Sequence, residues 1–375
     1  MNWSKIFVPS ACGTCSCGAA WDKRDVSDDW LDVEGCHVAY LYDFHCVNVY
    51  YRLCSTCTNK KRYDGIENNV LWFGSFSISH AVLKDYIRHF LVSSLPMYKY
   101  YVTYVQRQVI SVNLNFSGII TYTKFRLAVT AMIRLLDIDF VDAFHCNICG
   151  KHPKKVVMDG TALGIQKTFL PRKVAPQKAL RWMEDKFETR NFLNRKRQRV
   201  VEEIYKEPNY RRRTRGINLG SICYGFQVMP DHESPNVPFT ILRTRFSEAP
   251  ELVIYDNACK LHEYCLNRDP AFFKKSKFIV DKFHWRNHSG CSEGYDINRY
   301  PILKTHNSQA AEQCNSVMKP LASMVSYMEY DNFLLFSKLY IWYRNMLRII
   351  KCNPGRDVPE GNVSCNQQYY QISSI

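Results

Sequence analysis

Cysteine is concentrated at the amino-terminal end of this sequence. Seven of the sixteen cysteines fall within the first 57 residues, in the segments CGTCSCG and LCSTC and between them. The chain opens without the basic start and long apolar stretch of a secretory signal, so we expect an intracellular protein with reduced thiols. Closely spaced reduced thiols favour structural Zn²⁺ over disulfides. The expected ligands are Cys12, Cys15, Cys17, Cys36, Cys46, Cys54 and Cys57.

The spacing of these cysteines favours one or two tetrahedral sites. Each C-x2-C pair offers two ligands from a single tight turn, and the extra cysteines can complete one site or two. Between the pairs, the segment CHVAYLYDFHCVNVYYRL is typical of two short β-strands. Residues 1–60 are therefore expected to form a small zinc-binding β module.

Two further groups of cysteine and histidine occur later in the chain. The segment FHCNICGKHP offers half of a zinc site through Cys146, Cys149 and His152. A third set could close a structural zinc site, with two ligands on one helix face and three more downstream. Alternatively, Cys259 and Cys265 are small buried hydrophobic residues and the histidines belong to the core. The third set is Cys259, His262, His284, His288 and Cys291.

Composition indicates a folded protein with an acidic partner. The chain has 375 residues, enough for two or three domains. Of these residues, 46% are hydrophobic, a share that excludes a disordered chain. The net charge of +15 favours nucleic acid as the partner, with a membrane surface as the competing explanation. No window of about 18 apolar residues free of charge exists, so we expect no membrane span and take DNA as the partner.

The middle and the end of the chain contain helical patterns. In 61–144, apolar residues recur at helical spacing in two segments, and the aromatic stretch MYKYYVTYVQ between them is expected to be irregular and to pack in a core. This range is interpreted as a helical connector. Near the end, YDNFLLFSKLYIWYRNMLRII predicts amphipathic helices that pack on a sheet, or else mediate a homodimer, and 351–375 is a polar tail.

Two acids share one context. Asp159 ends the run VVMD and Asp256 ends the run LVIYD, so each follows a β-rich apolar segment. Neighbouring buried strands would bring both carboxylates to one edge, where their repulsion favours bound Mg²⁺ or Mn²⁺. Glu312, near the start of a predicted helix, is the expected third acid. Three such acids are typical of two-metal phosphoryl transfer.

The order strand-Asp, strand-Asp, helix-Glu, together with YDNAC and KFHWRNHSGC, resembles the Kyakuja-Dileera-Zisupton (KDZ) family of DDE transposases. The resemblance implies an RNase H-like mixed α/β sheet flanked by helices over 145–350, with Asp159, Asp256 and Glu312 as catalytic acids. It also implies that Asp281 and His284 form a [C/D]-x2-H element. The segment AAEQCNS departs from the family around Glu312, and a large helical insertion is absent before it. A domesticated, inactive protein that binds DNA or chromatin is therefore the alternative.

A strongly basic segment, 176–216, interrupts the expected RNase H-like domain. Residues 195–215 contain nine Lys or Arg against three Glu. One interpretation is a solvated helix face or a nuclear address, the other is a contact with the DNA backbone, and the two are compatible. A nuclear location is expected. The candidate DNA contacts are Arg195, Lys196, Arg197, Arg199, Arg211, Arg212, Arg213 and Arg215.

Overall fold

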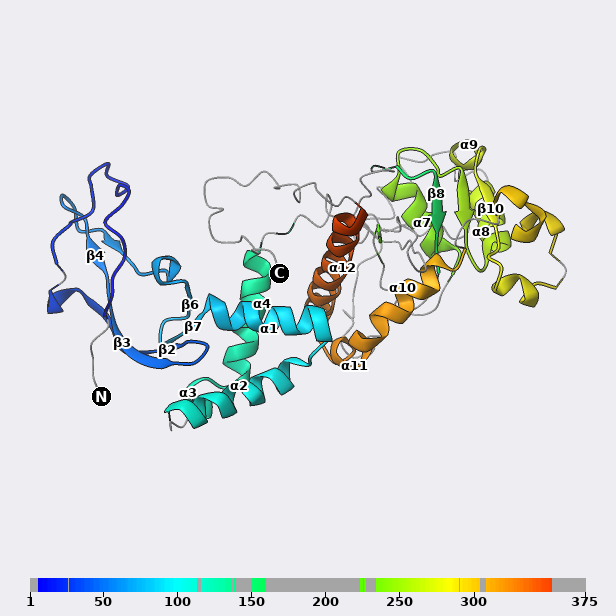
Figure 1. Cartoon of the computed structure of the whole chain (residues 1–375). Coiled ribbons are helices and arrows are strands. Elements are labelled where there is room, and N and C mark those ends of the chain that lie inside the picture. Colours follow the sequence, from blue (N-terminus) through cyan, green and yellow to red (C-terminus); the bar gives the residue numbers. More distant parts are fainter. Residues whose placement is uncertain are drawn as a thin grey trace. The chain divides into compact units, whose positions relative to one another are not determined.

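The computed structural model divides the chain into two compact units, Met1–Asp137 (the amino-terminal unit) and Ile138–Ile375 (the carboxy-terminal unit), coloured along the chain in Figure 1. None of the described helices combines the length and apolar character that crossing a bilayer needs. The structure describes residues 6–25, 27–112, 116–136, 138, 150, 152–159, 223, 224, 226, 234–289, 291–303 and 308–352.

A five-stranded mixed sheet, in the order β1-β3-β2-β7-β6, forms the first half of the amino-terminal unit. β2 and β3 are antiparallel, which confirms the expected pair of strands, while β7 runs parallel to β2. Two of the strands, β6 and β7, come from the range expected to be helical. The strands are β1 (Ile6–Phe7), β2 (Leu31–Ala39), β3 (Phe44–Tyr50), β6 (Val70–Trp72) and β7 (Phe76–Ser79).

Small elements surround this sheet. β4 (Arg52–Leu53) and β5 (Lys60–Lys61) form a separate antiparallel hairpin, and 3-10 turns occupy Asp28–Trp30 and Ile66–Asn68. Gly65 has φ +88°, and a Cβ on it would lie 2.2 Å from the carbonyl oxygen of Val70. Only glycine therefore fits this turn between β5 and β6.

Four helices complete the amino-terminal unit. They are α1 (His80–Ser93), α2 (Met97–Val112), α3 (Phe116–Ile119) and α4 (Tyr122–Leu135). α2 covers the aromatic stretch expected to be irregular, so that expectation is wrong. Its buried side chains Met97, Tyr100, Tyr101 and Tyr104 repeat at helical spacing, and this buried stripe stabilises the helix. The expectation that these aromatic side chains pack in a core is confirmed.

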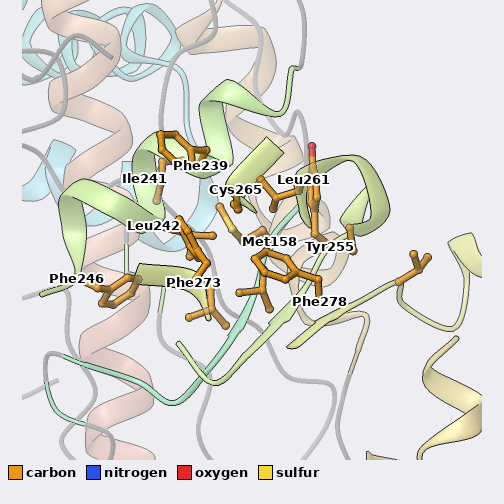
Figure 2. Packing of buried hydrophobic residues seen from close by; sticks show 14 of the residues in the cluster. Met158, Phe239, Ile241, Leu242, Phe246, Tyr255, Leu261, Cys265, Phe273 and Phe278 are labelled. Carbon is orange, nitrogen blue, oxygen red and sulfur yellow. The ribbon is translucent and has the colours of Figure 1, made fainter. Parts of the chain in front are cut away.

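The carboxy-terminal unit is built around a three-stranded parallel sheet, in the order β10-β9-β8. β8 (Lys155–Val157) and β9 (Leu252–Ile254) are the two strands expected before the acids, and β10 (Lys277–Ile279) adds a third. One sheet face packs against α7 (Asn236–Arg245), α8 (Ala258–Leu266) and α9 (Pro270–Phe273). Figure 2 shows the buried side chains of this core, including Met158, Phe239, Leu242 and Phe273.

The opposite face of this sheet is covered by the region around α10 (Ala310–Met318). Val157, Ile254 and Ile279 point to this side and pack with Ala310 and Ala311. The remaining helices are α11 (Ala322–Val325) and α12 (Tyr330–Cys352), with 3-10 turns at His284–Asn287, Glu293–Tyr295, Ile297–Arg299, Pro301–Leu303 and Lys319–Leu321. The expected α/β class with a preceding cysteine cluster is thus confirmed, together with the helices at 310–318 and 330–352.

Candidate functional site

Four cysteine sulfurs converge in the amino-terminal unit. They belong to Cys15, Cys17, Cys54 and Cys57, and all lie within 4.8 Å of one another. The Sγ atoms of Cys15 and Cys57 are 3.6 Å apart, and those of Cys17 and Cys54 are 3.5 Å apart. A tetrahedron of thiolates with Zn–S bonds of about 2.3 Å has edges of roughly 3.8 Å. This tetra-cysteine cluster can therefore hold a metal ion such as Zn²⁺.

Two tight turns present these sulfurs. In the first, the N–H of Gly18 donates to the carbonyl oxygen of Cys15, and Gly18 adopts φ +86°, which favours glycine. In the second, the N–H of Cys54 donates to the carbonyl oxygen of Asn59 as the β4–β5 hairpin closes. The Asn59 side-chain amide lies 3.2 Å from the Sγ of Cys15, so it links the two turns. Asn59 is not among the residues expected from the sequence, although its place two residues after Cys57 is a position from which a side chain reaches back to the cluster.

Hydrogen bonding stabilises thiolates within this cluster. The pKa of Cys15 is lowered to about 6, first by the backbone N–H of Cys17 and then by the Asn59 amide. Backbone N–H groups two and three residues further on likewise lower the pKa of Cys54. At Cys57 the Asn59 N–H favours the thiolate, yet burial and the three neighbouring sulfurs raise its pKa to about 12. A bound cation would replace this remaining proton and offset the repulsion among the sulfurs.

Three other expected ligands lie outside the cluster. Cys12 is exposed, and the structure uses Cys15 with Cys17, not the C-x2-C pair of Cys12 with Cys15. Cys36 is fully buried in the sheet core with Val38 and Val49, and burial raises its pKa to about 12. Cys46 lies on β3 opposite His37, away from the β4–β5 hairpin that carries the ligands. The strand position of Cys36 explains the difference, since alternation directs its side chain into the core.

Of the zinc half site expected from the segment FHCNICGKHP, the structure describes only His152. Cys146 and Cys149 lie outside the described residues. His152 is exposed and its ring makes an edge contact with Phe246, with ring centroids 6.4 Å apart.

A second group of potential ligands lies in the carboxy-terminal unit. Cys259, His288 and Cys291 place their sulfur and nitrogen atoms within 4.8 Å of one another, and all three are partly buried. Cys259 is in the first turn of α8, whereas the other two follow the turn after β10. The expected set was larger. The structure brings three of its five members together.

The two remaining members of that set make other contacts. The Nδ1 of His262 is 2.9 Å from the hydroxyl oxygen of Tyr295, and its ring stacks on Phe278. The Nδ1 of His284 is 2.6 Å from Oδ2 of the buried Asp281, whose Oδ1 accepts from the N–H of His284. The expected role of His262 and His284 in this cluster is therefore corrected: one belongs to an aromatic contact and the other to the Asp281 turn.

The two strand-end acids follow adjacent strands in register. β8 and β9 are parallel and Val157 pairs with Ile254, so Asp159 and Asp256 each lie two residues beyond a paired position. Val157 and Ile254 both face α10, and alternation assigns the two acids to the same side of the sheet. The Oδ2 of Asp159 accepts from the side chain of Asn315 on α10, at 2.6 Å. Asp256 accepts through Oδ1 from the N–H of Asn257, at 2.7 Å.

The third expected acid, Glu312, is on α10. It lies three residues before Asn315 in the sequence. Asn315 is not among the residues expected from the sequence, although its spacing of three residues from Glu312 in a predicted helix indicates it. The eight basic residues within 195–215 lie outside the described residues.

Comparison of the chain with protein-family models, curated proteins and solved structures finds no match. The function is therefore inferred from the cysteine clusters and the acids described above.

Proposed function

We propose that this chain is a transposase-derived DNA-binding protein whose carboxy-terminal unit is an RNase H-like nuclease or strand transferase that depends on divalent metal ions. The observation that carries the proposal is the register of β8 with β9, which puts Asp159 and Asp256 at equivalent ends of adjacent parallel strands. In parallel sheets, ligands bind beyond the carboxyl ends of the strands.

The donor atoms at this edge fit Mg²⁺ or Mn²⁺. Both ions prefer hard oxygen ligands, and two carboxylates in one setting are stabilised by a cation between them. Asp159 and Asp256 would hold the ions, and Glu312 on α10 is the proposed third ligand. When bound, such a pair of ions activates a water molecule or a 3′-hydroxyl and neutralises the charge on the leaving oxygen.

The remaining residues have supporting roles in this proposal. Asn315 fixes the orientation of the Asp159 carboxylate by donating to one of its oxygens. Zn²⁺ in the tetra-cysteine cluster would stabilise the amino-terminal unit. The net charge of +15 supports DNA as the partner, and the arginine-rich segment supports contacts to its backbone and a nuclear location.

The alternative is a domesticated protein that binds DNA or chromatin through its zinc-stabilised fold but does not cut it. The contact between Asn315 and Asp159 is compatible with this alternative as well, because an amide donor also stabilises a carboxylate that binds no ion. Both functions share the basic sequence and the cysteine cluster. They differ in whether the three acids bind a divalent ion.

A nicking and strand-transfer assay with Mn²⁺ or Mg²⁺ separates the two functions. The wild-type chain should nick DNA, and Asp256→Ala should reduce the rate by on the order of 10³-fold while DNA affinity is retained. Asp331→Asn, which changes an exposed acid at the start of α12, is the matched control and should leave the rate unchanged. If the wild type binds DNA but neither protein nicks it, the binding function is correct and the nuclease proposal is wrong.

A further inference from the structure

Cys259, His288 and Cys291 have the spacing of ligands around one tetrahedral ion. The Sγ atoms of Cys259 and Cys291 are 3.5 Å apart, and the Nδ1 of His288 lies 3.7 Å and 3.4 Å from them, respectively. Bond lengths of about 2.3 Å for Zn–S and 2.0 Å for Zn–N predict edges of roughly 3.5–3.8 Å. A disulfide would need sulfur atoms about 2.05 Å apart. The group therefore fits a shared cation.

The hydrogen bond made by Nε2 of His288 determines which ring nitrogen carries the hydrogen and which has a free lone pair. Nε2 is 2.8 Å from the backbone carbonyl oxygen of Asp256. A carbonyl oxygen can only accept, so Nε2 carries the hydrogen and donates it. In a neutral imidazole, Nδ1 is then unprotonated and directed at the two cysteines. Metal-binding histidines typically use the same division of roles, with one nitrogen on the metal and the other on a backbone carbonyl.

The three ligands come from segments that follow neighbouring strands. Cys259 lies three residues after Asp256 at the end of β9, and His288 and Cys291 follow the turn after β10, which pairs with β9. An ion here would link these two strand ends. His288 would connect it directly to the residue that carries the second expected acid.

We propose that Cys259, His288 and Cys291 bind a structural Zn²⁺ separate from the tetra-cysteine cluster, and that this ion positions Asp256 through the hydrogen bond from His288. The described residues supply three of the four ligands that a tetrahedral zinc ion takes. The zinc site itself goes beyond the proposed nuclease function. The consequence for catalysis rests on that function, since it requires Asp256 to be a ligand of the divalent ions.

Zinc content tests the site without any assay of activity. Compared with the wild type, Cys291→Ser should contain one fewer equivalent of zinc per chain. Cys314→Ser is the matched control, because it changes another partly buried cysteine of the same unit, on α10, and should retain all of the zinc. Substitution of Co²⁺ should give thiolate-to-metal absorption that is weaker in Cys291→Ser than in the control. Equal zinc content in Cys291→Ser and the wild type would overturn the proposal.

A measurement on the wild type guards against a variant that fails to fold. Alkylation followed by mass spectrometry should find Cys259 and Cys291 protected in the purified protein and reactive after treatment with a zinc chelator. Protection that survives chelation in folded protein, or a disulfide between the two cysteines under reducing conditions, would overturn the site.

Hydrogen exchange tests the link to Asp256. In Cys291→Ser, amides of the turn 255–259 should exchange at least tenfold faster than in Cys314→Ser. The reason is that His288, which donates to the carbonyl oxygen of Asp256, is no longer held in place by the metal ion. Unchanged exchange together with lost zinc would overturn the positioning role. Lost zinc and faster exchange in a protein that never nicks DNA would refute the nuclease function while this inference stands.

Discussion

Asn315 donates its side-chain amide to the carboxylate of Asp159 at 2.6 Å, across 156 residues of sequence. The contact joins α10 to the end of β8, and Asn315 is buried with 9% of its surface exposed. It brings the helix that carries Glu312 to the strand end that carries Asp159. The position of α10 relative to the strand end that carries Asp159 therefore depends on this contact.

Asn315→Ala should lower the free energy of unfolding by about 1.5–3 kcal/mol, because a hydrogen bond to a charged carboxylate is lost in a buried place. Asn315→Asp should destabilise the chain further, since it puts a second negative charge beside Asp159. Thermal unfolding measured with and without Mn²⁺ checks both effects. If the edge binds divalent ions, Mn²⁺ should raise the melting temperature of Asn315→Asp more than that of the wild type.

Asn298→Asp is the matched control for this added negative charge. Asn298 also donates its amide to an aspartate of the same unit, Asp296, at 2.8 Å, and Asp296 is not one of the three expected acids. The Asn298→Asp variant should be destabilised, and Mn²⁺ should not restore its melting temperature. Equal recovery of both variants would show that Mn²⁺ merely screens added acids, and it would remove this support for a divalent site.

Cys54→Ser should remove one equivalent of zinc and destabilise the amino-terminal unit, because three thiolates no longer saturate a tetrahedral ion. Cys12→Ser should retain all of the zinc, since Cys12 is exposed outside the cluster. Zinc analysis and limited proteolysis check these outcomes. Loss of zinc from Cys12→Ser would show that the sequence expectation for Cys12 was correct and that the ligand set in the structure is incomplete.

Cys36 gives a prediction about pH. Burial raises its pKa from 9.0 to about 12, so between these values the unfolded chain loses its thiol proton while the folded chain keeps it. The native state therefore binds more protons, and this contribution to stability is present below pH 9 and is lost as pH rises towards 12. Cys36→Val removes the titrating group at similar size. In urea unfolding, the stability of the wild type relative to Cys36→Val should fall from pH 8 to pH 11.

The same variant tests whether Cys36 binds metal. A core thiol predicts unchanged zinc content in Cys36→Val, whereas a ligand predicts loss of one equivalent. A stability difference that does not change with pH would contradict the role of Cys36 as a buried, protonated thiol.

Replacing Arg211, Arg212, Arg213 and Arg215 with alanine tests the expected DNA contacts. Each lost contact with a phosphate should reduce the slope of log affinity against log salt concentration by about 0.9, and the loss should be similar for unrelated DNA sequences. Fluorescence anisotropy at several salt concentrations measures the slope. An unchanged slope would leave this segment as a nuclear address or a solvated surface.

Local patterns in the sequence were sufficient for much of this protein. Apolar, β-rich runs before Asp159 and Asp256 predicted β8 and β9, because strand formation there needs only a short buried segment. Helix-forming composition predicted α10, an amphipathic pattern predicted α12, and the density of cysteine predicted a metal cluster. The aromatic stretch in α2 was misjudged because many tyrosines suggest no regular structure until their spacing is counted.

Tertiary structure alone decided which of several similar residues meet. Cys12 and Cys17 flank Cys15 and are both candidates in the sequence, but the turn closed by Gly18 selects Cys17. His284 and His288 are one helical turn apart in sequence. His284 nevertheless bonds to the carboxylate of Asp281, whereas His288 lies beside the sulfur of Cys259. These choices depend on the pairing of β9 with β10 and on the packing of turns far apart in the chain. Spacing in the sequence fixes which ligands are available, and the pairing of distant segments fixes which of them share an ion.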